Sequence, residues 1–496
     1  MANTRRIAKN TLMLYFRQIL IMLVSLYTVR AVLETLGAED YGINNLVAGV
    51  VTMFGFLSSS MATASQRYFA FELGRGNYEQ LQKTFSLSFL VYIVIATAVL
   101  LLAETIGLWF INNKLIIPQD RMEAAHWIYQ CSIISFLFTI LVTPFMAAII
   151  AHEDMNIYAT VSIVEAVLKL GIVFLLKIIA LDKLQLYGIL LCVVTIINTG
   201  IYRSICKHKY QECRFRFYWN KGLFNELISY TGWNLFGSLA GIFKNQGVNI
   251  LLNQFFNPLV ITSRGIASTV NTAVVSFSQN FSTALRPQII KNYASGYKDE
   301  FMLWMSRGSK ATYFLMYLFI LPLLLEMSTV LSLWIKNVPE YTVIFTRLIL
   351  IDALIDSISF TIVTSVQAIG RIRLYQSVVG GILLLNVPLS WIVLFMGYPP
   401  YSVMIVGICL TFMAFILRLL IMRILIDFSI LQFLKEILLP VCEVSVLSMI
   451  LPIIFHVNLR QDLFRFFLVV GISIVSICGS VYLLGLTSIE RYKIIT

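Results

Sequence analysis

Long apolar segments recur along almost the whole chain, with only short polar stretches between them. A helix that crosses the hydrocarbon core of a bilayer needs about 20 apolar residues, and runs of this length follow one another from Thr11 to Leu486. Hydrophobic residues make up 59% of the chain and charged residues only 12%, whereas soluble proteins carry about 25% charged residues. The chain is therefore expected to be an all-α polytopic membrane protein.

The apolar segments predict about 14 transmembrane helices. They cover residues 11–34, 41–64, 85–110, 122–150, 156–178, 185–204, 225–254, 259–284, 309–335, 342–369, 374–396, 402–424, 432–456 and 463–486. The longest breaks, near 65–84, 205–224 and 285–308, are too short for a soluble domain. This excludes a nucleotide-binding cassette or an external enzyme domain.

Lys and Arg are unevenly divided between the two sets of loops. On the side of the N-terminus they include Arg5, Arg6, Lys9, Arg67, Arg75, Lys83, Lys207, Lys209, Arg214, Lys291, Lys310, Arg371 and Arg418. The opposite side has only Lys114, Arg121, Lys177, Lys183, Lys336, Arg460 and Arg465. Because positively charged loops stay in the cytoplasm, both termini are expected to be cytoplasmic. The net charge of +12 is explained by these loops, so no nucleic acid is expected as a partner.

A weak internal repeat relates the two halves of the chain. A shift of 220 residues places 61–79 on 281–299, so that Thr63, Ala64 and Gly76 align with Thr283, Ala284 and Gly296. This predicts an N-terminal six-helix lobe (1–204), a basic cytoplasmic linker (205–224), a C-terminal six-helix lobe (225–425), and helices 13 and 14 with a cytoplasmic tail (426–496). Two repeat-related lobes with an axis along the membrane normal are typical of transporters with a cavity between the lobes.

The segment from Arg30 to Gly42, Arg-Ala-Val-Leu-Glu-Thr-Leu-Gly-Ala-Glu-Asp-Tyr-Gly, carries a recognisable motif. It resembles the Arg-x(n)-Leu-Gly-x-x-x-Tyr-Gly signature of bacterial polysaccharide flippases, the O-antigen and capsule repeat-unit (Wzx-type) flippases. These belong to the multidrug/oligosaccharidyl-lipid/polysaccharide exporter (MOP) superfamily. The Gly-Arg-Gly-Asn step at 74–77, the helix count and the two lobes support the resemblance over the whole chain.

The resemblance implies a function and a location. Such a protein translocates a polyprenyl-pyrophosphate-linked oligosaccharide from the cytoplasmic to the periplasmic leaflet of the bacterial inner membrane by alternating access, for surface polysaccharide biosynthesis. The extra helix pair would border a groove for the polyprenyl tail. Expected partners are the lipid-linked glycan, membrane lipid and, in the same pathway, polysaccharide-assembly enzymes; a monomer is the default.

Six basic residues fall inside the predicted helices. They are Arg17, Arg30, Lys169, Lys244, Arg264 and Arg347. Each would cost about 2.5–3.5 kcal/mol at a lipid-facing helix centre, so most must face protein or water. A cavity lined by Arg17, Lys244 and Arg264, with Arg30 and Lys169 as further candidates, would suit a pyrophosphate. In the alternative, Arg30 and Arg347 reach the headgroups and Lys169 pairs with Glu165 four residues before it.

Polar residues at helical spacing support the same faces. Asn234, Asn245 and Asn249 recur in 225–254, Ser268 and Asn271 in 259–284, and Asn45 lies in 41–64. Residues three or four positions apart share one side of a helix. These side chains would line a hydrated path for sugars, or they pack helix against helix; the sequence leaves both open.

Carboxylates are candidates for ion coupling, since no nucleotide site is present in the sequence. Asp352 and Asp356 lie four residues apart on one face of 342–369, and acids inside a membrane are candidates for proton or sodium coupling. The alternative is that they form salt bridges with Arg347 or other cavity cations. Glu326, after Pro322, is a further acid that a proline kink could expose. No cofactor and no metal site is expected beyond a possible coupling ion.

Two other functions compete with the flippase. A multidrug or cation exporter of the same superfamily would favour an acidic, aromatic cavity. A membrane glycan polymerase or ligase would carry a large external loop, and every predicted external loop is short. No catalytic constellation is present, so a transporter rather than an enzyme is expected.

Overall fold

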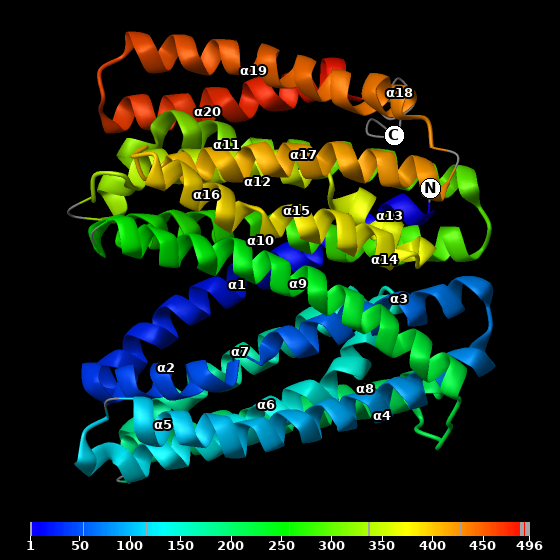
Figure 1. Cartoon of the computed structure of the whole chain (residues 1–496), viewed down its shortest axis with the longest axis vertical. Helices are drawn as coiled ribbons and strands as arrows, with labels where there is room; N and C mark the ends of the chain where they lie inside the picture. The colour runs from blue at the N-terminus through cyan, green and yellow to red at the C-terminus, as the bar shows by residue number, and fades with distance from the viewer. Residues whose placement is uncertain are drawn as a thin grey trace. The chain divides into compact units, whose positions relative to one another are not determined.

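The protein is built from helices. The computed structural model describes residues 2–52, 54–115, 117–179, 181–256, 258–335, 338–426, 428–486 and 491. All regular elements in these ranges are helical (Figure 1). The prediction of an all-α membrane protein is therefore confirmed.

The chain forms two compact units, residues 1–235 and 236–496. The boundary lies within one helix, α9 (Lys221–Phe255). The first unit contains α1 (Ala2–Leu36), α2 (Ala38–Thr52), α3 (Gly55–Arg75), α4 (Tyr78–Leu102), α5 (Leu108–Lys114), α6 (Met122–Ala151), α7 (Met155–Ile178) and α8 (Lys183–Lys209). Short π and 3-10 turns, η1 (Ala103–Gly107), η2 (Gln119–Arg121) and η3 (Gln211–Cys213), connect or extend them.

The second unit contains the remaining helices. They are α10 (Pro258–Ala294), α11 (Lys298–Trp334), α12 (Thr342–Ser357), α13 (Phe360–Ile369), α14 (Ile372–Tyr375), α15 (Gly381–Leu384), α16 (Asn386–Phe395), α17 (Ser402–Leu425), α18 (Ile430–Phe433), α19 (Leu439–Asn458) and α20 (Leu463–Ser480). The π turns η4 (Gln376–Gly380), η5 (Leu434–Leu438) and η6 (Val481–Gly485) adjoin α14, α18 and α20. Its core lies mainly among α11, α12, α13 and α17, with Tyr317, Ile320, Leu350 and Ile362 fully buried.

Fewer helices than predicted qualify as membrane spans when helix length and composition are the criteria. Among the described residues, 10 helices are long and apolar enough to cross a membrane, or up to 12 if each of two bent pairs is one span. The count of about 14 is therefore not confirmed. α9 and α10 are not among the 10, although their 35 and 37 residues at about 1.5 Å each exceed the thickness of a bilayer core. They carry polar faces that include Lys244 and Arg264.

Two of the predicted single helices are broken. The segment predicted at 41–64 is part of a pair, 40–51 and 55–75, bent by 52°, and the segment predicted at 342–369 is the pair α12 and α13, bent by 42°. Hydropathy cannot detect such bends because apolar residues continue through them. The protein is thus a multi-pass membrane protein in which two apolar helix pairs are bent, each with the geometry of a broken span or a re-entrant loop.

Two of the long polar breaks are largely helical. α3 continues to Arg75 and α4 begins at Tyr78, and similarly α10 ends at Ala294 and α11 begins at Lys298. The predicted loops 65–84 and 285–308 therefore shrink to a few residues. Hydropathy marks where a helix leaves the apolar layer, whereas the backbone hydrogen bonds of the helix continue into water.

The repeat-related glycines Gly76 and Gly296 end these helices in the same way. Their φ angles are 68° and 80°, in the left-handed region that favours glycine. After α3 the amide of Asn77 donates to the carbonyl of Glu72, and after α10 the amide of Tyr297 donates to that of Asn292, both bonds spanning five residues. The aligned positions thus share one local structure.

In the first unit, a polar cluster joins the α6–α7 turn to η3. His152 Nε2 contacts the Glu212 carboxylate, and its ring stacks on Tyr210 with centroids 4.2 Å apart. Tyr210 donates to Asp154, which also pairs with Lys209 at 3.0 Å. Burial alone would raise the pKa of Glu212, but the interaction with His152 outweighs it, and the pKa of this carboxyl lies below its usual value. The pKa of Asp154 is lowered in the same way by Tyr210 and Lys209 against the effect of burial.

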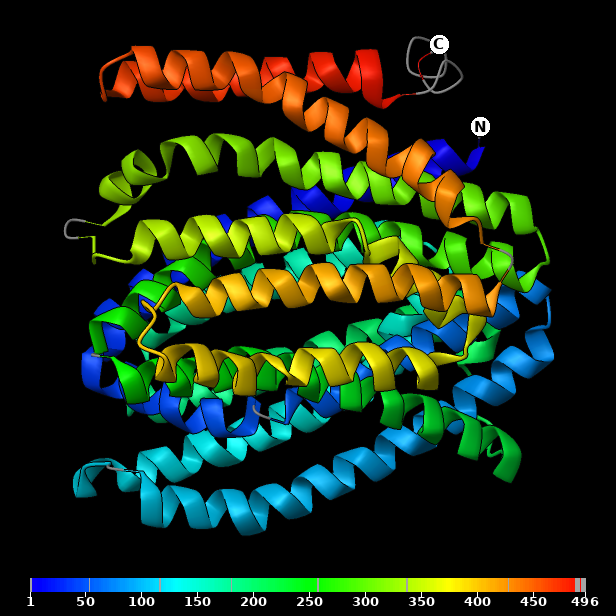
Figure 2. The same cartoon turned by 45° about the horizontal axis from the view of Figure 1, so that its top comes forward.

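In the second unit, α19 and α20 lie side by side (Figures 1 and 2) and pack on α11. The kink in α11 after Pro322 turns Glu326 inward, where it is 1% exposed. Its carboxylate pairs with Arg465 of α20 at 3.0 Å and with His456 of α19 at 2.8 Å, and Thr329 donates to it at 2.9 Å. Glu326 is thus buried in an ion-pair network that ties the helix pair to α11, and the kink does not expose it.

The first testable prediction concerns this network. Arg465→Met leaves the buried Glu326 carboxylate without its strongest partner, and breaking a buried ion pair costs about 3–5 kcal/mol. We expect the unfolding temperature of the detergent-purified protein to fall by several degrees. Arg460→Met, at an exposed position of the same connection, is the matched control and should change little. Adding Glu326→Gln to Arg465→Met should recover part of the loss; no recovery would contradict an ionic origin.

The second prediction concerns the Glu212 cluster and pH. A carboxyl whose pKa is lowered by folding stabilises the folded state above its unfolded pKa of about 4.3, and this contribution disappears as pH falls through the lower folded pKa. We therefore expect thermal stability to drop below about pH 4.3 and Glu212→Gln to make that drop shallower. Thermal unfolding measured from pH 7 to pH 3 tests this, with the exposed Glu300→Gln as control. Equal slopes for wild type and Glu212→Gln would refute it.

Candidate functional site

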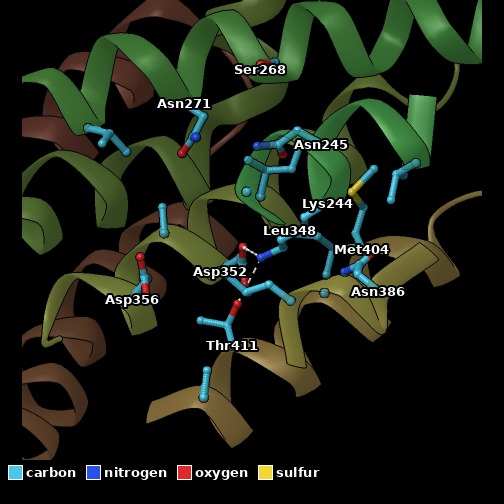
Figure 3. A pocket seen from close by; sticks show the side chains of 18 of the residues that line it. Lys244, Asn245, Ser268, Asn271, Leu348, Asp352, Asp356, Asn386, Met404 and Thr411 are labelled. Carbon is cyan, nitrogen blue, oxygen red and sulfur yellow. Dashed lines mark hydrogen bonds and ion pairs between the residues drawn. The ribbon is translucent and has the colours of Figure 1, made fainter. Parts of the chain in front are cut away.

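A polar pocket lies inside the second unit, between α9, α10, α12, α16 and α17. Its volume is about 340 Å³, within the usual range for small-ligand sites. The polar residues that line it are Lys244, Asn245, Arg264, Ser268, Asn271, Gln279, Asp352, Asp356, Asn386, Thr411 and Arg418. Figure 3 shows side chains from α9, α10, α12, α16 and α17 around this pocket.

Helical spacing places these residues on one side of each helix. On α9, Gly241, Lys244, Asn245 and Val248 line the pocket, at steps of three and four residues. On α10 the corresponding residues are Arg264, Ser268, Asn271, Val275 and Gln279. The predicted polar faces of these two helices therefore meet in one cavity, so that a packing role alone does not account for them.

Lys244 forms the first ion pair of the pocket. Its Nζ lies 3.2 Å from Asp352 Oδ2 and 3.2 Å from the hydroxyl of Thr411 (Figure 3). The other carboxylate oxygen of Asp352, Oδ1, is buried without a hydrogen bond among the described residues. One carboxylate thus carries a single ionic contact and retains an unused acceptor.

Arg418 forms the second ion pair. Its Nη1 lies 2.5 Å from Asp356 Oδ1, and its Nε donates to the Tyr375 hydroxyl at 3.2 Å. Arg418 is 7% exposed and lies in the body of α17. The sequence-based placement of Arg418 in a cytoplasmic loop is therefore wrong, because a charge near the end of an apolar run was counted with the loop.

Arg264 differs from the other two cations. It is 8% exposed, and its Nη1 donates to the carbonyl of Asn245 at 2.9 Å and to the side chain of Asn249. No carboxylate lies within 4.0 Å of it among the described residues, and its Nε is buried without a hydrogen bond. Three cations and two carboxylates therefore line the pocket, and Arg264 provides the surplus positive charge.

The remaining predicted residues lie elsewhere. Asn249 does not line the pocket. Its side-chain oxygen accepts a hydrogen bond from Arg264, and its amide nitrogen donates to Gln246 at 3.0 Å. Arg17, Arg30, Lys169 and Asn234 belong to the first unit, and the side chain of Asn45 lies outside the described residues. Asn234 is buried.

The cations of the first unit have local partners. Arg17 lies 4.7 Å from the centre of the Tyr158 ring. Arg30 is exposed and pairs with Glu34 at 2.9 Å, one turn along α1. Lys169 pairs with Glu165 at 2.6 Å, and Asn198 donates to the same carboxylate at 2.9 Å. Lys169 thus forms the ion pair with Glu165, four residues before it, that was the alternative to a role in the cavity.

Sequence reasoning missed four pocket residues, Gln279, Asn386, Thr411 and Arg418. A signal for two of them was present, since Gly407, Thr411, Ala414 and Arg418 follow a three- and four-residue rhythm in 402–424. Asn386 lies where a π turn and a short helix interrupt the segment predicted at 374–396, so no regular spacing marked it.

The two candidate coupling acids are both ion-paired, Asp352 with Lys244 and Asp356 with Arg418. Their partners are these residues and not Arg347, which donates to the carbonyl of Leu325 at 3.4 Å. Among the described residues no group of three or more His, Cys, Asp or Glu side chains is placed to hold a metal ion. Each acid is therefore held by one basic side chain in this structure.

Comparisons with known proteins identify the fold. No family profile and no curated protein sequence matches the chain. Solved structures do match. A "MATE in the straight conformation" has a TM-score of 0.74 at 11% identity, covering 85% of this chain and 96% of that one. A "multidrug resistance MATE family transporter of the MOP superfamily" in an outward-facing conformation has 0.72 at 12%, covering 85% and 95%. The "MATE transporter ClbM in complex with Rb+" has 0.70 at 13%, covering 86% and 96%. The chain therefore has the fold of MATE transporters of the MOP superfamily.

Proposed function

We propose that the protein is a flippase for a polyprenyl-pyrophosphate-linked oligosaccharide. The observation that carries the proposal is the surplus cation, because Arg264 is buried in a polar pocket with no carboxylate partner in the described part of the chain. A buried guanidinium is expensive unless it is paired, and a pyrophosphate offers the bidentate oxygen acceptors that a guanidinium prefers. The amide and hydroxyl groups of Asn245, Ser268 and Asn271 supply hydrogen bonds for sugar hydroxyls.

The proposed transport mechanism depends on the contacts of Lys244. Among the described residues Lys244 contacts Asp352 and Thr411, so an incoming anion competes for it with one carboxylate. Asp352 then becomes free to accept a proton or a sodium ion, which supplies a route for coupling to an ion gradient. In this proposal the chain lies in the bacterial inner membrane with both termini in the cytoplasm, acts as a monomer, and receives its substrate from the enzymes of polysaccharide assembly.

A multidrug exporter is the second candidate. It is favoured by one solved structure of this fold, which is described as a multidrug resistance transporter, and by the two carboxylates in the pocket. The two candidate functions differ in the charge of the substrate, which is negative for the flippase and positive for the exporter. Expression in a strain that lacks its own drug exporters, with growth measured on cationic drugs, separates them. Resistance to those drugs without an effect on surface polysaccharide would favour the exporter, whereas cytoplasmic accumulation of lipid-linked oligosaccharide on gene deletion would favour the flippase.

The third prediction tests Arg264. Arg264→Gln removes the unpaired charge, and charge-assisted hydrogen bonds are worth about 1.5–3 kcal/mol, so we expect flipping to fall about tenfold to a hundredfold. Arg264→Lys should retain part of the activity because the charge remains. The assay is the leaflet distribution of lipid-linked oligosaccharide in a deletion strain that expresses each variant at equal level.

Arg30→Gln is the matched control, because Arg30 is exposed and paired with Glu34. This variant should flip substrate as wild type does. If Arg264→Gln also retains wild-type flipping, the surplus cation is not the substrate site and the proposal fails.

The fourth prediction tests coupling through Asp352. Asp352→Asn mimics the neutral acid and releases Lys244, so binding of a short-chain polyprenyl pyrophosphate should become several-fold tighter. In proteoliposomes the same variant should flip substrate at a rate that no longer responds to a proton or sodium gradient. Asp352→Glu retains the charge and serves as control. Unchanged gradient dependence in Asp352→Asn would show that coupling does not pass through this acid.

A further inference from the structure

Basic and aromatic side chains follow one another in the connection between α8 and α9. Residues 214–219, Arg-Phe-Arg-Phe-Tyr-Trp, are not helical, and we call them the aromatic linker. Phe217 is 77% exposed and Trp219 is 55% exposed, and Arg214 and Arg216 are exposed as well. Aromatic surface of this size is favourable only next to an apolar neighbour.

Two hydrogen bonds fix the backbone of the aromatic linker to α4. The side chain of Gln82 donates to the carbonyl of Arg214 at 3.3 Å. The amide of Arg216 donates to the hydroxyl of Ser86 at 3.2 Å. In an extended chain these two groups, two residues apart, point to the same side, whereas successive side chains point to opposite faces. The linker is therefore extended here, with Phe215 on the face opposite to Arg214 and Arg216.

The contacts with α4 give the depth of the aromatic linker. α4 is polar from its start to Lys83 and predominantly apolar afterwards. The ring of Phe215 packs on that of Phe89 with centres 5.6 Å apart. From Lys83 to Phe89 the helix rises about 9 Å, close to the thickness of one headgroup layer. With Lys83 at the boundary to water, the linker lies level with the headgroups, on the side that the charge distribution predicts to be cytoplasmic.

The aromatic linker also contacts the start of α9. The rings of Trp219 and Phe224 have their centres 4.8 Å apart. The side chain of Asn220 accepts a hydrogen bond from the amide of Leu223 at 3.0 Å, as an N-cap residue does. Whatever holds the aromatic linker therefore also holds the first turn of α9.

The interface between water and lipid favours these two kinds of side chain. Trp and Tyr concentrate at this level of a bilayer, and Lys or Arg beside it are attracted by anionic lipids. We propose that the aromatic linker is a membrane anchor that binds the anionic phospholipid surface. Arg214 and Arg216 contact the headgroup phosphates, while Phe217 and Trp219 enter the boundary with the acyl chains.

The fifth prediction uses Trp219 as the probe, in the full-length protein reconstituted into phosphatidylcholine nanodiscs. The chain has 7 Trp, so the signal of Trp219 is the fluorescence of wild type minus that of Trp219→Phe. Lipid brominated in the acyl chain close to the headgroup should quench this signal, and acrylamide in the water should quench it little. Brominated phosphatidylglycerol should act at about tenfold lower mole fraction than brominated phosphatidylcholine, because two cations attract it.

The double variant Arg214→Gln/Arg216→Gln tests the charges, with its own Trp219→Phe partner for subtraction. It should be quenched by the two brominated lipids at equal mole fractions. The matched control is Lys298→Gln/Arg371→Gln, which removes the same charge from exposed positions of the second unit and should retain the preference for phosphatidylglycerol. Glycerol phosphate added to the buffer should not change the quenching, because the binding surface is the bilayer.

Four outcomes would overturn the proposal. Quenching by acrylamide and not by brominated lipid would place Trp219 in water. Protection from both quenchers would mean that protein covers it. Equal quenching of wild type by the two lipids would remove the anionic preference, and a preference that survives in Arg214→Gln/Arg216→Gln would assign it to other residues. Because no measurement involves oligosaccharide or the pocket of Arg264, this proposal can fail while the flippase proposal stands, and the reverse.

Discussion

The cost of placing charge in a low-dielectric membrane governs this protein. Each buried charge must meet an opposite charge, a dipole or water, and the described helices show the first two solutions. Asp356 meets Arg418 at 2.5 Å, and Glu165 meets Lys169 one turn away. Arg264 meets only carbonyl and amide oxygens. The pattern of complete and incomplete compensation therefore distinguishes charges that hold the fold from charges that remain available to a ligand.

The C-terminal helix pair shows complete compensation. Glu326 receives three partners from α11, α19 and α20, the hydroxyl of Tyr317 donates to the carbonyl of Ser445 at 2.9 Å, and Lys310 donates to the carbonyl of Gly485 at 3.3 Å. Polar contacts thus fasten the pair to α11 at three levels. Between lipid-like surfaces the hydrophobic effect provides little attraction, so hydrogen bonds and close packing must hold such helices together. This pair is anchored to its unit and does not rest on α11 through apolar contact alone.

Sequence patterns predicted the fold class and seven of the eleven polar residues of the pocket, and the reason is periodicity. Lys244, Arg264, Asp352 and Asp356 lie on regular helical faces, and the structure brings all four to one cavity, although their role in binding stays a prediction. Arg418 was misplaced because hydropathy cannot tell a charge at the end of a span from one beyond it. The bends between α2 and α3 and between α12 and α13 were missed because apolar residues run through them. Partners such as Tyr375 for Arg418 depend on tertiary packing, which no spacing within one helix reveals.

The pocket of the second unit combines compensated and uncompensated charges. In the pocket of the second unit, both acids are occupied by Lys244 and Arg418, and the one cation without an acid partner in the described chain is Arg264. An anion can satisfy that charge without displacing anything, and it must displace Asp352 to reach Lys244. In the proposed mechanism, binding of the anion and release of the acid are therefore linked through a single lysine, Lys244.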